Sequence, residues 1–208
     1  MQDRQQSGWD RRTFLGAATL LALALGDPLR AASLANLGPA DAPTKRQRLL
    51  MKDLAQLVLP RTGTPGAGEA GAGDFAILAL AHGLGGARKS VAAGSVPARF
   101  VRSDGSLAHV AWIESELDSR SGGAFLKTAP ARRAALLTAL DAEAFAPGEG
   151  DHPWKAIKAA ILTGYYTSEI GASQELQYEH VPGRFDPDLP LTPGYRAWSS
   201  DWTAVEFG

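Results

Sequence analysis

Apolar side chains return every three to four residues over long stretches of this chain, which is the spacing of one face of an α-helix. In the stretch from residue 44 to residue 59 that face carries four aliphatic side chains, namely Leu50, Leu54, Leu57 and Val58. Pro60 follows this stretch and cannot continue a helix. The pattern therefore predicts a helix over residues 44–59 that ends before Pro60.

Four more helices are predicted from the same spacing and from signals at their ends. They cover residues 75–84, 106–121, 130–145 and 153–171. Asp74 stands where it can cap the first of them, and Pro130 and Pro153 stand at the first turns of the last two. In the last helix one face carries Trp154, Ile157, Ile161 and Tyr165. The sequence thus predicts a mainly α protein with little strand.

Three segments lack the helical pattern. Residues 60–74 are rich in glycine and are either a flexible linker or an ordered surface loop. Residues 85–105 are ambiguous, and residues 96–106 favour a short extended excursion. Residues 180–208 are rich in proline but also carry five large aromatic side chains, which are Phe185, Tyr195, Trp198, Trp202 and Phe207.

The aromatic side chains of residues 180–208 need a surface to cover, because solvated tails usually contain few aromatic residues. One interpretation packs this segment on the helices of its own chain. The other lays it across a second protein chain. On the second interpretation the protein is a single helical domain with long irregular, aromatic-rich segments that wrap a partner.

The N-terminus has the features of a twin-arginine export signal. Two adjacent arginines precede a Phe-Leu pair, and the residues concerned are Arg11, Arg12, Phe14 and Leu15. The apolar run that follows ends at Leu25, well short of the roughly 20 residues that span a membrane. We therefore expect a signal peptide at residues 1–35, a folded domain at residues 36–208, no membrane span, and a periplasmic location.

Composition and charge exclude several kinds of site and ligand. The chain has no cysteine, so it contains no disulfide, no thiolate metal site, no iron–sulfur cluster ligand and no thioether attachment of haem. Residues 36–208 hold 17 basic and 19 acidic residues, which gives a net charge of −2. This balance predicts neither nucleic acid nor an anionic membrane surface as a ligand.

Familiar catalytic motifs are missing from the sequence. The glycine-rich stretch follows a helix, so it lacks the strand–glycine–helix frame of a dinucleotide site, and there is no G-x-S-x-G elbow. No two of the four histidines have the i, i+4 spacing of a helical metal site; these are His82, His109, His152 and His180. Carboxylates near Tyr165 and Tyr166, which are Glu169, Glu175 and Glu179, are better interpreted as an interface face than as an acid–base group. We predict no catalytic, cofactor-binding or metal-binding residue in this chain.

A twin-arginine signal on a chain without its own cofactor suggests that the chain carries a partner across the membrane. Two C-terminal stretches, "GYYTSEIGA" at residues 164–172 and "LQYEHVPGRFD" at residues 176–186, resemble a signature of the gluconate 2-dehydrogenase subunit 3 family. The stretch "LVLPRTGTPGAGEAG" at residues 57–71 resembles the N-terminal signature of the same family. The similarity covers most of residues 44–208.

This resemblance implies a small helical subunit of a periplasmic, FAD-dependent dehydrogenase that oxidises the CH–OH groups of sugars or sugar acids. It implies that FAD lies in a large subunit of the glucose–methanol–choline type and that a haem c subunit is a third component. It also implies that the small subunit has no catalytic residue and serves the folding and export of the large one. The ending "SSDWTAVEFG" resembles the branch that oxidises glucosides or disaccharides at ring carbon 3.

We expect the large subunit to be held by the end of the last helix and by the aromatic tail, because aromatic residues and arginine dominate binding energy at interfaces. The predicted interface residues are Tyr165, Tyr166, Glu169, Tyr178, Arg184, Trp198 and Trp202. Three alternatives remain from other classes. They are an independent periplasmic enzyme, a periplasmic ligand-binding protein, and a structural adaptor of a different redox enzyme.

Overall fold

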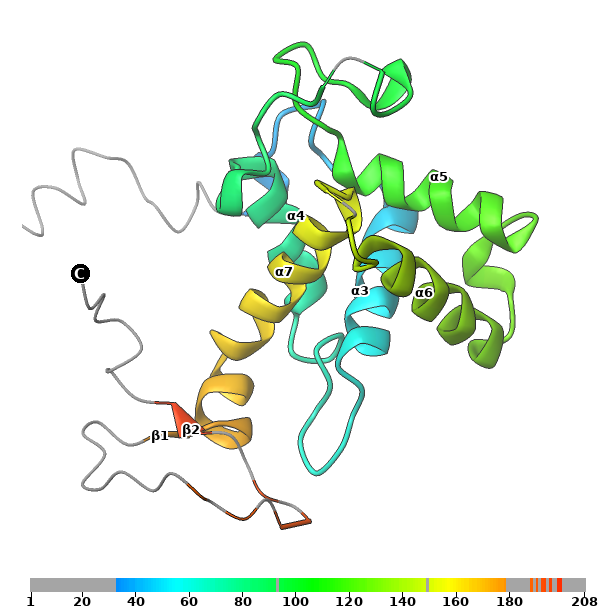
Figure 1. Ribbon diagram of the computed structural model, residues 1–208. Helices are drawn as coiled ribbons and strands as arrows, with labels where there is room; N and C mark the ends of the chain where they lie inside the picture. Colours follow the sequence, from blue (N-terminus) through cyan, green and yellow to red (C-terminus); the bar gives the residue numbers. More distant parts are fainter. Residues whose placement is uncertain are drawn as a thin grey trace, which may run out of the picture. The chain divides into compact units, whose positions relative to one another are not determined.

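The structure is a computed structural model, shown in Figure 1. It describes residues 33–92, 94–148 and 150–178, and seven single positions between residues 188 and 199. The chain divides into two compact units, Met1–Ala42 and Pro43–Gly208. The predicted export signal, with Arg11, Arg12, Phe14 and Leu15, lies outside the described residues.

The described part of the first unit is a short capped turn. Ser33 precedes a 3₁₀ turn at Leu34–Asn36, and its side chain accepts a hydrogen bond from the backbone amide of Ala35. None of the described helices, in either unit, is long and apolar enough to cross a membrane.

The second unit is built from helices. Its described α-helices are α3 (Lys45–Val58), α4 (Ala72–His82), α5 (His109–Ser121), α6 (Pro130–Ala144) and α7 (Pro153–Tyr166). Among the described residues the only strands are β1 (Gln177–Tyr178) and β2 (Trp198–Ser199), which pair in parallel. The prediction of a mainly α, single helical domain is confirmed, whereas the wrapping of a partner stays a prediction.

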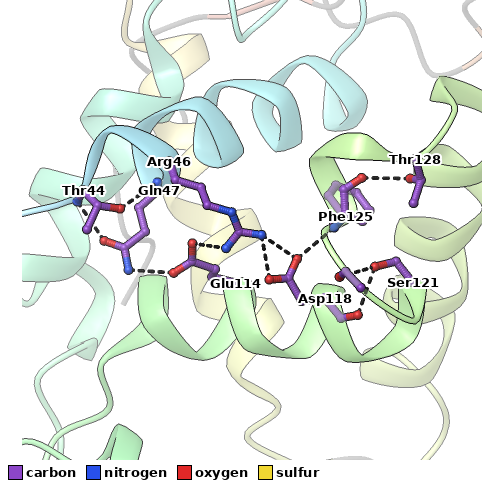
Figure 2. A network of polar contacts seen from close by, with 9 residues as sticks. Thr44, Arg46, Gln47, Glu114, Asp118, Ser121, Phe125 and Thr128 are labelled. Atoms are coloured by element: carbon purple, nitrogen blue, oxygen red, sulfur yellow. Dashed lines mark hydrogen bonds and ion pairs between the residues drawn. The ribbon is translucent and has the colours of Figure 1, made fainter.

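Helix α3 begins at a capping box. The side chain of Thr44 accepts a hydrogen bond from Gln47 N (3.1 Å), and Gln47 Oε1 accepts one from Thr44 N (2.9 Å). Figure 2 shows that the network continues to α5, where Gln47 Nε2 donates to Glu114 at 2.9 Å. Arg46 donates to the same carboxylate and, at 2.6 and 2.7 Å, to Asp118, which holds the pKa of Arg46 above its usual value. The first turn of α3 is thereby joined to α5.

Helix α4 begins at Ala72, three residues before the predicted start. The prediction that Asp74 caps this helix is wrong, because Asp74 lies inside the first turn and its carboxylate accepts hydrogen bonds from Arg48 at 2.6 and 3.2 Å. The residue before the helix is Gly71 at φ +82°, a left-handed conformation that glycine adopts without strain. The turn into α4 therefore depends on backbone conformation and not on a side-chain cap.

The ambiguous residues between α4 and α5 form an ordered excursion. Two isolated antiparallel bridges order it, Ser90 with Ser106 and Val101 with Leu107. Because these bridges hold Ser106 and Leu107, α5 begins at His109 and not at residue 106 as predicted. The prediction of a short extended segment at residues 96–106 is confirmed at Val101 and Ser106, which lie in these bridges. It is wrong at Ala98–Phe100, which forms a 3₁₀ turn.

Helix α6 has nearly the predicted bounds, whereas α7 ends at Tyr166 instead of residue 171. Thr167 Oγ1 donates a hydrogen bond to Thr163 O (2.7 Å), and Ser168 Oγ donates one to Tyr165 O (2.6 Å). Hydroxyl side chains that bind the last carbonyls compete with the bonds of the helix itself, so the helix stops here. The chain then makes a π-helical turn at Gly171–Glu175.

Helix α4 packs along both α7 and α3, and α5 and α6 lie to the right of these helices in Figure 1. The predicted apolar face of α7 is confirmed as core: Trp154, Ile157 and Ile161 are completely buried, and Tyr165 nearly so. Burial of such a side chain contributes about 1.5–3 kcal/mol. The helices approach closely at Gly164, where an added Cβ would lie 2.6 Å from Phe75 Cδ1.

Candidate functional site

The glycine-rich segment between α3 and α4 is an ordered loop and not a flexible linker. Thr64 is only 4% exposed, and residues 66–68 are buried with it. The backbone amide of Ala67 donates to Leu59 O (2.9 Å), and that of Thr62 donates to Thr64 O (3.1 Å). The loop therefore has a fixed conformation against the end of α3.

The carboxylate of Glu69 stabilises this loop through two hydrogen bonds within it. Glu69 Oε2 accepts a hydrogen bond from the backbone amide of Gly66 (2.9 Å), and Oε1 accepts one from Arg61 Nη2 (2.6 Å). The hydrogen bond from Arg61 holds the pKa of Glu69 below its usual value. Both side chains are largely exposed, so the ion pair itself adds little stability.

Glycine is required in the loop because the backbone lies directly on α3. A Cβ at Gly66 would stand 2.4 Å from Gln56 Nε2 and 2.8 Å from Arg61 N. A Cβ at Gly68 would stand 2.5 Å from the carbonyl oxygen of Lys52. The sequence "TPGAG" thus allows this loop to pack on α3. This packing places Thr64 and Pro65 next to the end of α7.

The loop and the end of α7 meet in a small polar cluster, Thr64, Tyr165 and Glu175, which we call the junction cluster. Tyr165 Oη donates a hydrogen bond to the carbonyl of Pro65 (3.2 Å) and lies 3.3 Å from Thr64 Oγ1. Thr64 Oγ1 donates in turn to Glu175 Oε2. Residues more than one hundred positions apart in the sequence are joined in this way.

Glu175 reaches the cluster because the chain reverses tightly after α7. Ser168 Oγ accepts a hydrogen bond from the backbone amide of Gly171 (3.1 Å). A Cβ on Gly171 would lie only 2.0 Å from Tyr165 O, so only glycine fits this reversal. The π-helical turn then returns Glu175 to the buried Thr64.

The junction cluster is closed rather than open to a substrate. Tyr165 is 3% exposed and its hydroxyl is engaged with the loop, so the ring belongs to the core of its own chain. Tyr166 packs edge-to-face on Tyr165, with ring centroids 5.2 Å apart, and is 38% exposed. Glu169 is also exposed in the turn that follows. The junction cluster therefore forms a rigid joint between the loop at residues 60–71 and the end of α7. One aromatic side chain, Tyr166, and one acidic side chain, Glu169, are exposed beside this joint.

The structure thus separates the predicted interface residues into groups. Tyr165 is buried in the core of its own chain, whereas Tyr166 and Glu169 are exposed, and the role of all three at a partner interface stays a prediction. Tyr178 lies in β1 and Trp198 in β2, whose backbones pair as Gln177 with Trp198 and Tyr178 with Ser199. Arg184 and Trp202 lie outside the described residues.

Sequence reasoning did not identify Thr64, Pro65 or the role of Glu175 in the joint. The sequence did indicate the two segments involved, because the Thr-Pro-Gly stretch and the Gly-Tyr-Tyr-Thr stretch both carry the resemblance to the family. Which side chains of the two segments meet depends on tertiary packing. The parallel pairing of β1 with β2 had no local signal, since each strand has two residues.

The described histidines do not come together. His82 is exposed at the end of α4, and His152 caps α7 with its ring 5.6 Å from that of Trp112. His109 is buried at the start of α5, and burial, together with the nearby Arg102, lowers its pKa to about 4. In the described part of the chain, no group of three or more His, Cys, Asp or Glu residues has the arrangement of a metal site.

Comparison with known proteins identifies the family. The family model described as gluconate 2-dehydrogenase subunit 3 matches residues 45–183, which is more than half of the 208 residues. No curated protein and no solved structure matches the chain significantly. The match runs from the first residue of α3 to beyond β1 and includes both segments of the junction cluster. The chain belongs to the gluconate 2-dehydrogenase subunit 3 family.

Proposed function

We propose that this chain is the non-catalytic small subunit of a periplasmic, FAD-dependent dehydrogenase that acts on sugars or sugar acids. The large subunit, of the glucose–methanol–choline type, holds FAD and performs the reaction, and a haem c subunit is a third component. The small subunit binds the large one in the cytoplasm, supports its folding, and supplies the twin-arginine signal that carries both across the inner membrane.

The observation that carries this proposal is the family match over residues 45–183, because that family is named for a subunit of a dehydrogenase complex. The junction cluster supports it as well. The polar groups of Thr64 and Tyr165 are buried and bound to each other, to the loop and to Glu175, which suits a scaffold better than a reacting centre. The exposed Tyr166 and Glu169 beside the cluster are available to a partner.

Binding a partner through such a joint has a physical advantage. A surface whose residues are already fixed loses little conformational entropy on binding, so more of the contact energy appears as affinity. Tyr166 offers a large apolar ring with a polar hydroxyl, a combination that is favoured at interfaces. The tail beyond β1 then extends the contact along the partner, as the sequence analysis predicts.

The test is to produce the proposed large flavoprotein subunit with and without this chain. We expect flavin-loaded, periplasmic enzyme only when both chains are present. The Arg11→Lys/Arg12→Lys variant should leave both chains in the cytoplasm, because the signal is read by a receptor and not by its charge alone. The matched control is Arg4→Lys, which changes an arginine outside the pair and should export normally.

Two results would overturn this function. Normal periplasmic dehydrogenase activity with the Arg11→Lys/Arg12→Lys variant would show that the large subunit does not depend on this signal. Sugar oxidation, or saturable sugar binding, by the purified chain alone would favour an independent enzyme or ligand-binding protein.

A further inference from the structure

The excursion between α4 and α5 has a charge opposite to that of the rest of the domain. We call residues 83–92 and 94–108 the basic excursion. It holds four cationic side chains and one acidic one, a net charge of +3: Arg88, Lys89, Arg99 and Arg102 against Asp104. The remainder of residues 36–208 has 13 basic and 18 acidic residues, a net charge of −5.

Two of the four cations of the basic excursion, Lys89 and Arg99, have no carboxylate partner among the described residues. In the other described parts of the second unit, five of the six arginines pair with a carboxylate, namely Arg46, Arg48, Arg61, Arg120 and Arg133. Here Asp104 pairs with Arg88 at 3.1 Å, while Arg102 donates to the backbone carbonyl of Leu107. Lys89 and Arg99 are exposed and form no ion pair with any described residue. Arg99 lies over the ring of Phe100, 4.6 Å from its centroid, so its charge contacts an aromatic ring but no carboxylate. Two positive charges therefore face solvent without a carboxylate partner in the described part of the chain.

These charges stand on a preformed support. The backbone amide of Val91 donates to Gly105 O (3.0 Å), and that of Ala108 donates to Phe100 O (2.8 Å). Phe100 is 8% exposed, so it anchors the excursion to the core. Because the backbone of the excursion is fixed, its charged side chains start from fixed positions. Binding to a surface of opposite charge benefits from such a fixed arrangement.

The pKa of a buried histidine next to the excursion is affected by the positive charges of this region. His109 follows the excursion directly, at the first residue of α5. Burial is the main cause that lowers its pKa to about 4, and the charges of Arg102 and Arg88 lower it further. The two guanidinium groups therefore both lie near His109, and each is close in sequence to one of the exposed cations, Lys89 or Arg99.

The mixture of side chains on the excursion favours a protein as ligand. Leu84 is 52% exposed and Val101 is 37% exposed, so aliphatic surface accompanies the charges. Lipid-binding surfaces usually combine four to eight accessible Lys or Arg residues, and membrane interfaces favour exposed Trp or Tyr. The single aromatic residue of the excursion, Phe100, is buried, and the domain as a whole is acidic. An acidic protein patch is a better match for two exposed cations without carboxylate partners and two exposed aliphatic side chains.

We propose that the basic excursion is a second docking surface of this subunit, which binds an acidic patch on the large dehydrogenase subunit. This inference rests on the proposed function. The excursion follows the end of α4, whereas the loop at residues 60–71 precedes its start, and Figure 1 shows the two at opposite ends of that helix. An 11-residue helix is about 16 Å long, so the two contacts are separate. The charges guide the encounter, and the junction cluster with the tail then provides the lasting contact.

The experiment measures the association rate of the two subunits at about 50 mM and about 500 mM salt, a range over which exposed charges become screened. The Lys89→Glu/Arg99→Glu variant should associate at least about tenfold more slowly than the unchanged chain at low salt and about equally at high salt. The matched control is Lys127→Glu/Arg132→Glu, which makes the same charge change on two exposed cations outside the excursion. It should have little effect. Circular dichroism verifies that each variant is folded, and the milder Lys89→Gln/Arg99→Gln variant replaces the first if it is not.

Each outcome decides the proposal. Equal association rates for the two doubly substituted chains would overturn the docking surface while leaving the proposed function intact. Binding of the unchanged chain to anionic phospholipid vesicles, lost in the Lys89→Glu/Arg99→Glu variant but not in the control, would assign the surface to lipid instead. If the unchanged chain does not bind the large subunit at any salt concentration, the proposed function fails, and this inference fails with it.

Discussion

At the scale of single residues, the described part of the chain buries three polar side chains, Thr64, Ser106 and His109, and only the first two bind a carboxylate. Thr64 donates to Glu175, and Ser106 Oγ donates to Asp104 Oδ1 at 2.6 Å. His109 remains uncharged instead, because its pKa is lowered to about 4, and its Nδ1 has no hydrogen-bond partner among the described residues. A buried polar group that is not hydrogen-bonded or kept neutral is costly, so these positions are sensitive to pH and to substitution.

The neutral state of His109 predicts that the protein loses stability as the solution becomes acidic. Its pKa is about 4 in the folded chain and 6.5 in the unfolded chain, so between these values the unfolded chain binds more protons. Stability is therefore complete above about pH 6.5 and falls on the order of 3 kcal/mol down to pH 4. Urea unfolding at pH 7, 5.5 and 4.5 measures this slope, and His109→Gln should flatten it. His82→Gln, at an exposed position, is the control; an identical slope in all three proteins would contradict the prediction.

At the scale of elements, periodicity predicted the helices well where apolar spacing continued and failed where polar contacts end a helix. Residues 44–59 and 130–145 became α3 and α6 almost unchanged. Helix α7 stops early because the hydroxyls of Thr167 and Ser168 bind its last carbonyls. The spacing of apolar residues gives no signal for such hydrogen bonds. The junction cluster was beyond sequence reasoning, since Thr64 and Tyr165 are 101 positions apart and meet only when α4 packs on α7.

Two adjacent tyrosines in α7 test the joint between this helix and the loop. Tyr165→Phe removes the hydroxyl that donates to Pro65 O and contacts Thr64, so the part-buried carbonyl of Pro65 loses this donor. We expect a loss of about 1–3 kcal/mol in the free energy of unfolding, measured in urea. Tyr166→Phe makes the same chemical change on a partly exposed ring and should stay within about 0.5 kcal/mol. Similar losses from both substitutions would mean that the joint does not depend on the Tyr165 hydroxyl.

At the scale of the whole molecule, the helices with a clear periodic pattern are distinct from the segments that we propose to bind the partner. The helices position the loop and the end of α7, and the family match ends at residue 183. Arg184, Trp198 and Trp202 lie beyond that match, so their predicted role rests on their own chemistry. The backbone pairing of β1 with β2 returns residue 198 to the strand that follows the junction cluster. A two-stranded pair this short is marginal in water, so a covering surface from a partner would stabilise it.

The last prediction concerns the tail. Removal of residues 190–208 deletes β2, so β1 loses its partner strand. The complex also loses four large aromatic side chains, Tyr195, Trp198, Trp202 and Phe207. Obligate interfaces bury more than about 2,000 Å², and an extended segment supplies much area per residue. We therefore expect a lower yield of flavin-loaded large subunit, with unchanged turnover for each flavin that remains. The matched control removes only residues 204–208 and keeps both tryptophans, and it should assemble fully. If the longer truncation assembles normally and only turnover falls, the tail shapes the active site, and the small subunit is not a purely structural component.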